Sequence, residues 1–363
     1  MATAPRTGVV HPSFRLDDLA QDPAGVFSRR AALRQFGGGC GAMLLATAAL
    51  RSTGVSAQDA ATPAATESDP LPETARGPAI PADKGYFVEE IADRLYWVTE
   101  GTYQAMFLAT GAGVIVVDAP PSIGENLLRA IAEMTDEPIT HVVYSHRHTD
   151  HIGAATLYPA DAMRIAHEAT AARLVLNADP NRPIPTETFT DSYDLTVGDQ
   201  MLRLEYQGQN HVPGNIFIHA PRQKVLMTVD IVEPGWVPFR RLGLAEDVFG
   251  FIQAHDQILG YDFETFVGGH LTRLGTRADV ELQARYVQDL VTNAGNALGS
   301  VDIAAVGAEV GFENQSQLFD TFLNRVTDLC TEAMVATWRG QLGGVEAFTN
   351  DNSDAMVGYL LIN

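Results

Sequence analysis

Lysine is nearly absent from this sequence. Only Lys84 and Lys224 are lysines among 24 basic residues, and 45 acidic residues give the 363-residue chain a formal net charge of −21. Because binding to nucleic-acid phosphates needs a basic face, this balance argues against a nucleic-acid partner. An acidic surface of this kind instead favours a soluble protein whose copies repel one another.

Cysteine is also scarce. Cys40 and Cys330 are the two cysteines of the chain, and Cys40 lies in an N-terminal segment that we expect to be removed. The mature protein would then carry one thiol and no internal disulfide. Its stability must come from a hydrophobic core, for which an apolar content of 46% is ordinary.

The sequence also lacks a hydrophobic run that could stay in a bilayer. Residues 36–50 are weakly apolar, but they are too short and too rich in glycine for a permanent membrane span. They follow Ser-Arg-Arg-Ala-Ala-Leu-Arg at residues 28–34, which resembles a twin-arginine export motif, and they precede small residues at 55–57 that suit cleavage. We therefore expect residues 1–57 to be a signal peptide for the twin-arginine export machinery, and the protein to be periplasmic or otherwise exported. A disordered N-terminus with a chance arginine pair is the alternative.

Three regions are expected after the signal peptide. Residues 58–84 are rich in Ala, Pro, Thr and acidic residues and indicate a flexible linker. Residues 85–285 contain short β-branched and aromatic segments separated by turn signals, so they would form the folded domain. Residues 286–363 are predicted to be a helical C-terminal extension, because apolar residues over 318–329 fall on one helical stripe. Packing against the domain is the expected role of this extension, with lining of the pocket or dimerisation as the alternatives.

The residues that carry chemistry concentrate at positions 145–151, Ser-His-Arg-His-Thr-Asp-His. The preceding Thr-His-Val-Val-Tyr of residues 140–144 predicts a buried strand, and residues 152–158 predict the start of a helix. The cluster would therefore stand at the end of a strand. In extended chain, alternate side chains point the same way, which places two of its imidazoles on one side. Two neutral imidazoles followed by a carboxylate and a third imidazole are typical of a zinc-like metal site.

The pattern His-x-His-x-Asp-His over residues 146–151 resembles the signature of the metallo-β-lactamase superfamily. The resemblance covers roughly residues 85–285 and implies an α/β fold, namely an αββα sandwich with a one- or two-metal site between the sheet edges. The residues agree with this fold class. A predicted strand at 114–117, a predicted helix at 123–134 and the strand at 140–144 form a strand–helix–strand unit.

The resemblance also implies a complete ligand set, residue by residue. His211 matches because it stands in a His-Val-Pro-Gly turn, whereas Asp230 and His270 each end a predicted strand. Asp118 ends the strand at 114–117 and is expected to support the metal-binding histidines from outside, with a turn-capping role as the alternative. The first metal would be held by His146, His148 and His211, and the second by Asp150, His151 and His270, with Asp230 as the bridge.

The function implied by the resemblance is metal-dependent hydrolysis. Two divalent ions, zinc first and iron or manganese as alternatives, would turn a shared water into an attacking hydroxide. The substrate would be a small molecule with an ester, lactone, thioester or amide bond, β-lactams included. Asp150 would also orient the nucleophile. Asp230 favours the oxygen-bridged arrangement of glyoxalase II-like and lactonase-like members over the thiolate of one lactamase group.

Two further aromatic residues and two competing functions remain open at this point. Tyr103, in a segment where family members carry a mobile loop, and Trp236, which follows the bridging aspartate, would line the substrate pocket or serve in ordinary packing. A mononuclear iron oxygenase acting on persulfides shares much of the ligand motif and is the first alternative function. A non-catalytic binding protein on the same fold is the second, although no expected ligand is missing.

Overall fold

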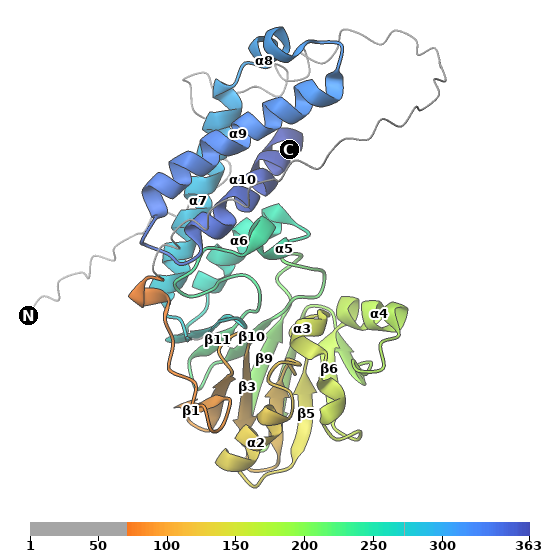
Figure 1. The fold of residues 1–363 in the computed structure, drawn as a ribbon. Coiled ribbons are helices and arrows are strands. Elements are labelled where there is room, and N and C mark those ends of the chain that lie inside the picture. The colour runs from red at the N-terminus through yellow and green to blue at the C-terminus, as the bar shows by residue number, and fades with distance from the viewer. Residues whose placement is uncertain (1–70, 272) are drawn as a thin grey trace, which may run out of the picture. The chain divides into compact units, whose positions relative to one another are not determined.

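The computed structural model describes residues 71–271 and 273–363 of the chain. The expected signal peptide, residues 1–57, and residues 58–70 of the expected linker lie outside the described residues. No helix within the two described ranges has both the length and the apolar character needed to cross a membrane. Strands alternate with short helices up to residue 267, and the chain is mainly helical from residue 277 to its end (Figure 1).

Two β-sheets form the centre of the fold. The seven-stranded sheet has the order β1-β2-β3-β4-β5-β6-β7, antiparallel from β1 to β4 and parallel from β4 to β7. The five-stranded sheet has the order β12-β11-β10-β9-β8, with β12 parallel to β11 and the other pairs antiparallel. The strands are β1 (Phe87–Ala92), β2 (Leu95–Thr99), β3 (Gln104–Ala109), β4 (Val114–Val117), β5 (Ile139–Val143), β6 (Met163–His167), β7 (Glu187–Phe189), β8 (Ser192–Val197), β9 (Gln200–Glu205), β10 (Phe217–Ala220), β11 (Val225–Met227) and β12 (Thr265–Val267).

Helices precede, connect and follow these strands. α4 is capped by His167, whose Nδ1 accepts a hydrogen bond from Ala169 N, and α6 is capped by Asp247. α5 is irregular, because three of its residues have left-handed backbone angles. The helices are η2 (Glu73–Ala75), α2 (Glu125–Met134), α3 (Thr149–Ile152), η3 (Ala155–Leu157), α4 (Glu168–Asn177), α5 (Arg240–Leu244), α6 (Val248–Leu259), α7 (Arg277–Ser300), α8 (Ile303–Val310), α9 (Gln315–Trp338) and α10 (Val345–Ile362).

Side-chain alternation along the strands produces three apolar clusters. Leu95 and Trp97 of β2 point between the sheets, where they belong to a cluster that includes Leu202 and Leu204 of β9. The intervening Tyr96 joins a second cluster that covers the outer face of the seven-stranded sheet together with α2. Because both faces of these strands are buried, their sequences are nearly continuous runs of apolar residues.

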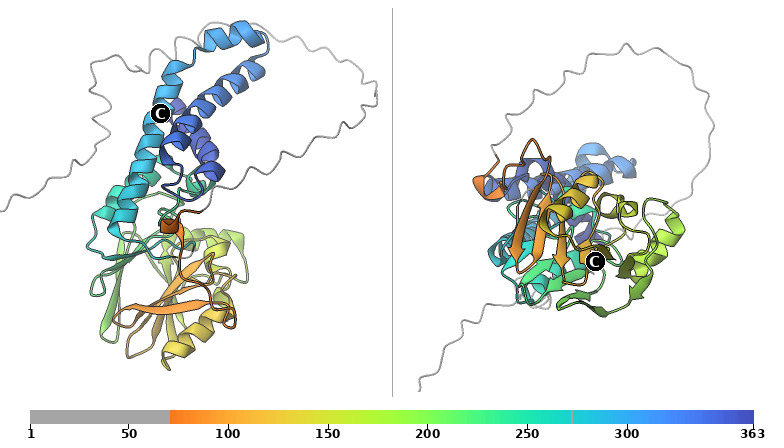
Figure 2. Two further views of the ribbon diagram at one scale, coloured as in Figure 1. Left: turned by 60° about the vertical axis from the view of Figure 1, so that its left-hand side comes forward. Right: turned by 90° about the horizontal axis from the view of Figure 1, so that it is seen from below.

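The third apolar cluster joins the five-stranded sheet to the helical extension. Phe217 and Leu226 point outward from β10 and β11 and pack with Phe251 of α6, Tyr286 of α7 and Met356 of α10. Figure 1 and the left view of Figure 2 show α7, α9 and α10 lying side by side. The predicted α/β sandwich with a helical C-terminal extension is therefore confirmed.

Three details differ from the sequence-based expectations. The helix expected to begin near residue 152 begins at Thr149, so it contains part of the metal-binding motif. Residues 71–84, expected to belong to a flexible linker, include η2, and Ala75 in it is buried and accepts a hydrogen bond from the Trp236 indole. The expected domain boundary at 285/286 falls inside α7, a continuous helix that begins at a Thr276 capping box.

Candidate metal centre

Four of the seven expected ligands come from the loop that follows β5. The strand ends at Val143, His146 and His148 lie in the loop, and Asp150 and His151 lie in the first turn of α3. The loop is anchored to the neighbouring strand because Asp118, just beyond β4, accepts a hydrogen bond from Ser145 N through Oδ1 at 2.8 Å. The local sequence thus places four ligands at the carboxyl end of a parallel strand, where loops commonly carry functional groups.

The other three ligands come from the five-stranded sheet and are far apart in the chain. His211 lies between β9 and β10, Asp230 follows β11 and His270 follows β12. Because β11 and β12 are parallel neighbours, Asp230 and His270 leave the same edge of the sheet. A Cβ on Gly269 would lie 2.7 Å from Val229 Cγ1, and Gly269 has a φ of +90°. Glycine is therefore required for the turn that directs His270 into the site.

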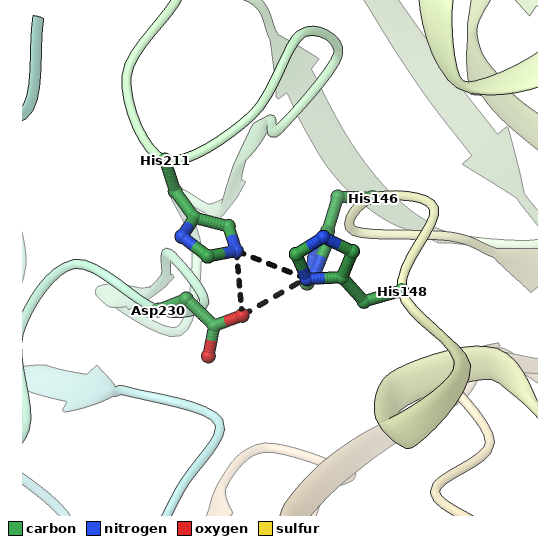
Figure 3. Close-up of side chains that lie close together, drawn as sticks. All are labelled: His146, His148, His211 and Asp230. Carbon is green, nitrogen blue, oxygen red and sulfur yellow. Dashed lines mark hydrogen bonds and ion pairs between the residues drawn. The ribbon is translucent and has the colours of Figure 1, made fainter. Parts of the chain in front are cut away.

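The first ligand set consists of His146, His148 and His211. Figure 3 shows these three imidazoles converging on the carboxylate of Asp230. Asp230 Oδ2 lies 3.3 Å from His146 Nε2 and 3.2 Å from His211 Nε2, and His211 Nε2 lies 3.1 Å from His148 Nδ1. Within the described residues, the ligand atoms of these three histidines and Asp230 all lie within 4.8 Å of one another.

The second ligand set consists of Asp150, His151 and His270, and it meets the other oxygen of the same carboxylate. Asp230 Oδ1 lies 3.2 Å from His151 Nε2 and 2.8 Å from His270 Nε2. Asp150 Oδ2 lies 3.6 Å from His151 Nε2 and 3.9 Å from His270 Nε2. The structure therefore brings all seven expected ligands together, with Asp230 between the two sets.

The protonation states favour ligation by the first set. Burial holds the pKa of His146 well below its usual value, and burial followed by the nearby His211 lowers the pKa of His148 to about 4. Burial disfavours ionisation of Asp230, but His151 and His211 outweigh that cost and hold the pKa of its carboxyl well below its usual range. Neutral imidazoles and an ionised carboxylate are the forms that bind a metal.

Among the buried charged groups of the site, His151 balances the charge of the carboxylates. Burial would lower the pKa of this imidazole, but the carboxylate of Asp230, aided by Asp118 and Asp150, raises it to about 9. Asp118 is fully buried, and burial raises the pKa of its carboxyl to about 6 against the opposing effects of His151 and Ser145.

The donor set fits metal ions. His146 Nε2 is buried and has no hydrogen-bond partner although it points at Asp230. A buried polar atom without a partner is costly, and a cation would satisfy it. Nitrogen donors with carboxylate oxygens are the ligands that zinc takes, and each set offers enough of them to hold one ion.

Hydrogen bonds from outside the ligand sets orient the histidines. Ser145 Oγ lies 3.0 Å from His146 Nδ1. Asp118 Oδ2 lies 4.0 Å from His151 Nδ1, close enough for a charge interaction but too far for a hydrogen bond. The structure thus places Asp118 beside the metal-binding loop, where the sequence predicted it.

The two aromatic residues expected near a substrate differ in their surroundings. The Tyr103 hydroxyl lies 3.4 Å from Asp150 Oδ2, and the Tyr103 ring is centred 4.6 Å from that of His270. Trp236 instead donates its indole N–H to Ala75 O, and its ring packs against Gly343. The structure therefore brings Tyr103, but not Trp236, into contact with the ligand sets.

Two residues near the site were not identified from the sequence. The Phe239 ring is centred 5.4 Å from His270 and also 5.4 Å from Phe348 of α10, so it links the helical extension to the site. Glu233 is 3% exposed, and burial together with Asp230 raises the pKa of its carboxyl well above the usual value. A charged residue within the apolar segment 231–237 was the available signal for Glu233, whereas no local signal marked Phe239.

The chain is similar to known proteins over its α/β region. Residues 98–270 match the family described as the metallo-beta-lactamase superfamily. The 2,4-dinitroanisole O-demethylase subunit alpha of Nocardioides sp. (strain JS1661) is 26% identical over 215 residues, which cover 53% of this chain and 61% of that protein. A metallo-beta-lactamase type 2 of Elizabethkingia meningoseptica is 24% identical over 159 residues, which cover 41% of this chain and 63% of that protein. The chain thus spans less than two thirds of the length of these curated relatives.

One solved structure is also similar to part of the chain. The metallo-beta-lactamase from Pontibacter korlensis shares 20% sequence identity and has a TM-score of 0.48. The superposition covers 99% of that protein and 56% of this chain.

Proposed function

We propose that this protein, whose residues 98–270 belong to the metallo-beta-lactamase superfamily, is a hydrolase that works with two divalent metal ions. The observation that carries the proposal is the orientation of Asp230. Its Oδ2 faces His146 and His211, and its Oδ1 faces His151 and His270. One carboxylate shared by two ligand sets suits a two-metal site. Zinc is proposed first because it takes imidazole and carboxylate ligands, with iron or manganese as alternatives.

Asp150 is the residue best placed to handle the proton of the attacking water. When bound, the two ions would supply an acidified water and a Lewis acid for the bond to be cleaved. The Asp150 side chain is 43% exposed, whereas that of Asp230 is 8% exposed. Asp150 Oδ2 accepts a hydrogen bond from the Tyr103 hydroxyl and is open to solvent, so it can orient a water and accept its proton.

The proposed substrate is a small organic molecule with an ester, lactone, thioester or amide bond, β-lactams included. The ligand position that bridges both sets holds the carboxylate of Asp230, and the cysteine within the described residues, Cys330, is buried among the helices of the extension. This supports an oxygen-bridged site without a thiolate. Tyr103 and Phe239 are both half-buried beside the His270 ring, and they offer an apolar wall for such a substrate.

Metal analysis combined with a hydrolysis screen tests this function. The panel should hold lactams, lactones, esters, thioesters and phosphodiesters. It should also hold 2,4-dinitroanisole, because the name of one relative identifies that compound as a substrate of O-demethylation. Two zinc ions per chain and hydrolysis of one class, lost with a chelator and restored by zinc, support the proposal. Iron with oxygen consumption on a persulfide would instead support the oxygenase, and a chain that takes up no metal would contradict both.

We also propose that the protein is exported as a folded protein by the twin-arginine route. The support is the sequence pattern at residues 28–34 followed by the weakly apolar residues 36–50. Mass spectrometry of the exported protein should find an N-terminus near residue 58. Arg29→Lys combined with Arg30→Lys should hold the full-length chain inside the cell, and unchanged export of that double variant would contradict the proposal.

A further inference from the structure

The loop that carries His270 is hydrogen-bonded to the opposite sheet. Gln104 N donates to Gly269 O at 2.8 Å, and Leu271 N donates to Thr102 O at 2.7 Å. Between these two hydrogen bonds, Tyr103 pairs with His270 as an isolated antiparallel bridge. A ligand from the five-stranded sheet is therefore held by the β2–β3 connection of the seven-stranded sheet.

The Gln104 side chain adds a second group of hydrogen bonds to the same loop. Its Nε2 lies 2.6 Å from His270 O, 3.1 Å from Leu271 O and 3.1 Å from Arg273 O. The Gln104 side chain is fully buried, so its amide N–H₂ needs protein acceptors, and its two N–H bonds are shared among these three carbonyls. Only the N–H₂ end of a carboxamide can donate to carbonyl oxygens, which fixes the orientation of the amide.

The connection that precedes Gln104 is short and is held by hydrogen bonds within it. Residues 100–103 link β2 to β3, and Glu100 Oε2 accepts hydrogen bonds from Thr102 N and Tyr103 N at 3.2 and 2.9 Å. Thr99 Oγ1 donates to Tyr103 O at 2.7 Å. This segment is therefore tied by its own hydrogen bonds, and it can serve as a support for the His270 loop.

We propose that Gln104 is a positioning residue for the second ligand set, which holds the His270 loop at the distance that the second metal ion requires. This inference rests on the two-metal site of the proposed function. Gln104 would act through the backbone carbonyls of His270, Leu271 and Arg273 and would touch neither metal nor substrate.

The first ligand set has a separate support, so the effect of Gln104 should be selective. Arg147 forms an ion pair with Glu246, and Glu246 N donates to His211 O at 2.7 Å. Arg182 Nη1 donates to Arg147 O at 2.6 Å. These contacts connect the loop of His146 and His148 to the loop of His211 without involving Gln104.

Zinc titration of Gln104→Glu tests the proposal. Glutamate has the same size but replaces the N–H₂ donor with an acceptor, which faces three carbonyl oxygens. Metal-free wild type and variant would be titrated with zinc by calorimetry, and bound zinc would be counted after dialysis. We expect the second zinc to bind about 10- to 100-fold more weakly in the variant, as is typical for residues that orient metal ligands. The first zinc should bind within about threefold of wild type, because its supports are unchanged.

Two further variants separate positioning from general damage. Gln223→Glu makes the same change at another buried glutamine, which donates to Asp93 O and Gln200 Oε1 and contacts no ligand, so both zinc ions should bind as in wild type. Gln104→Leu removes the donor without adding charge and should repeat the loss of the second zinc if Gln104→Glu fails to fold.

The outcomes distinguish a failure of the proposed role of Gln104 from a failure of the two-metal function. Full affinity for the second zinc in folded Gln104→Glu or Gln104→Leu, equal weakening of both zinc ions, or the same loss in Gln223→Glu would overturn the proposed role of Gln104. Wild type that binds fewer than two zinc ions would instead overturn the two-metal function, and the inference would fall with it.

Discussion

The two sheets of the sandwich supply the metal centre in different ways. The seven-stranded sheet gives His146, His148, Asp150 and His151 from one short loop and the helix that continues it. The five-stranded sheet gives its three ligands from loops spread over residues 211–270. Local chain geometry can therefore arrange the ligands from the seven-stranded sheet, whereas only the tertiary fold can arrange those from the five-stranded sheet.

The helical extension explains how the five-stranded sheet holds its ligands. Ile231 and Val232, directly after Asp230, pack in the cluster that contains α7, α9 and α10. Gln283 of α7 donates to Ile231 O at 2.6 Å and accepts a hydrogen bond from Glu233 N at 3.0 Å. The extension thus has a structural connection to the metal centre, through the segment that carries the bridging carboxylate.

Removal of Asp230 should break the connection between the two ligand sets and have the largest effect on metal binding and turnover. Asp230→Ala deletes the carboxylate that faces both ligand sets, so neither metal should bind with wild-type affinity. Because bound metals supply several kcal/mol of transition-state stabilisation, hydrolysis should fall by about 10³-fold or more. Zinc content and kcat of the purified variant are the measurements, with His219→Ala as control because His219 is equally buried but donates to Asp262 O. A variant that binds two zinc ions and turns over normally would contradict the assignment of Asp230 as a metal ligand.

Removal of one histidine from each ligand set, one from each sheet, should separate the contributions of the two metal sites. His148→Ala should reduce zinc bound by the first ligand set, and His270→Ala should reduce zinc bound by the second. Each loss should exceed the roughly 10- to 100-fold weakening that is typical when a residue orienting a ligand is changed, and turnover should fall with it. Zinc titration with kinetics measures both. Unchanged metal content and rate in His148→Ala would refute its assignment as a ligand.

The contrast between the sheets also explains what the sequence could predict. Residues 146–151 were recognisable because four ligands fall within one stretch whose geometry is local. The other three ligands could be identified only through the family resemblance. The local sequence around His211, Asp230 and His270 does not indicate that these residues lie close together in the fold. The individual strands followed from alternation and buried runs, whereas their arrangement in two sheets was implied by the family resemblance.

Residues that depend on packing between distant segments were not predictable. Gln104 begins a buried strand and Phe239 lies in an irregular segment, and neither position has a pattern that indicates contact with His270. The helix start at Thr149 was missed because the helix was predicted to begin only after the metal-binding motif, at residue 152. Ala75 was assigned to a linker because its burial depends on Trp236, far along the chain.

The pH dependence of stability can test how the segment after Asp230 is held. Burial and Asp230 raise the pKa of Glu233 well above its usual value, whereas in the unfolded chain a glutamate titrates near pH 4.3. Above that pH the unfolded chain releases a proton that the folded protein retains. The free energy of unfolding should therefore fall with rising pH, by up to about 1.4 kcal/mol per pH unit, until the folded carboxyl ionises.

Glu233→Gln removes that titration and should flatten the decline. Urea unfolding of chelated wild type and variant at matched pH values between 5 and 8 measures the difference, and the matched pH controls for every other titrating group. The advantage of the variant should grow with pH. A difference that stays constant over this range would show that Glu233 does not retain its proton in the folded protein.

The smallest effect on turnover is expected when the Tyr103 hydroxyl, which lies beside the second ligand set, is removed. Tyr103 belongs to the seven-stranded sheet side, yet its ring packs on His270 and its hydroxyl reaches Asp150 Oδ2 at 3.4 Å. Tyr103→Phe keeps the ring and removes one long hydrogen bond, worth about 0.5–1 kcal/mol, so kcat should fall about 2- to 5-fold with zinc content unchanged. Steady-state kinetics with zinc analysis decides the result. Loss of zinc would mean that the hydroxyl holds a ligand in place, and a fall of about 100-fold would mean that it acts on the substrate, because neither follows from orienting Asp150 alone.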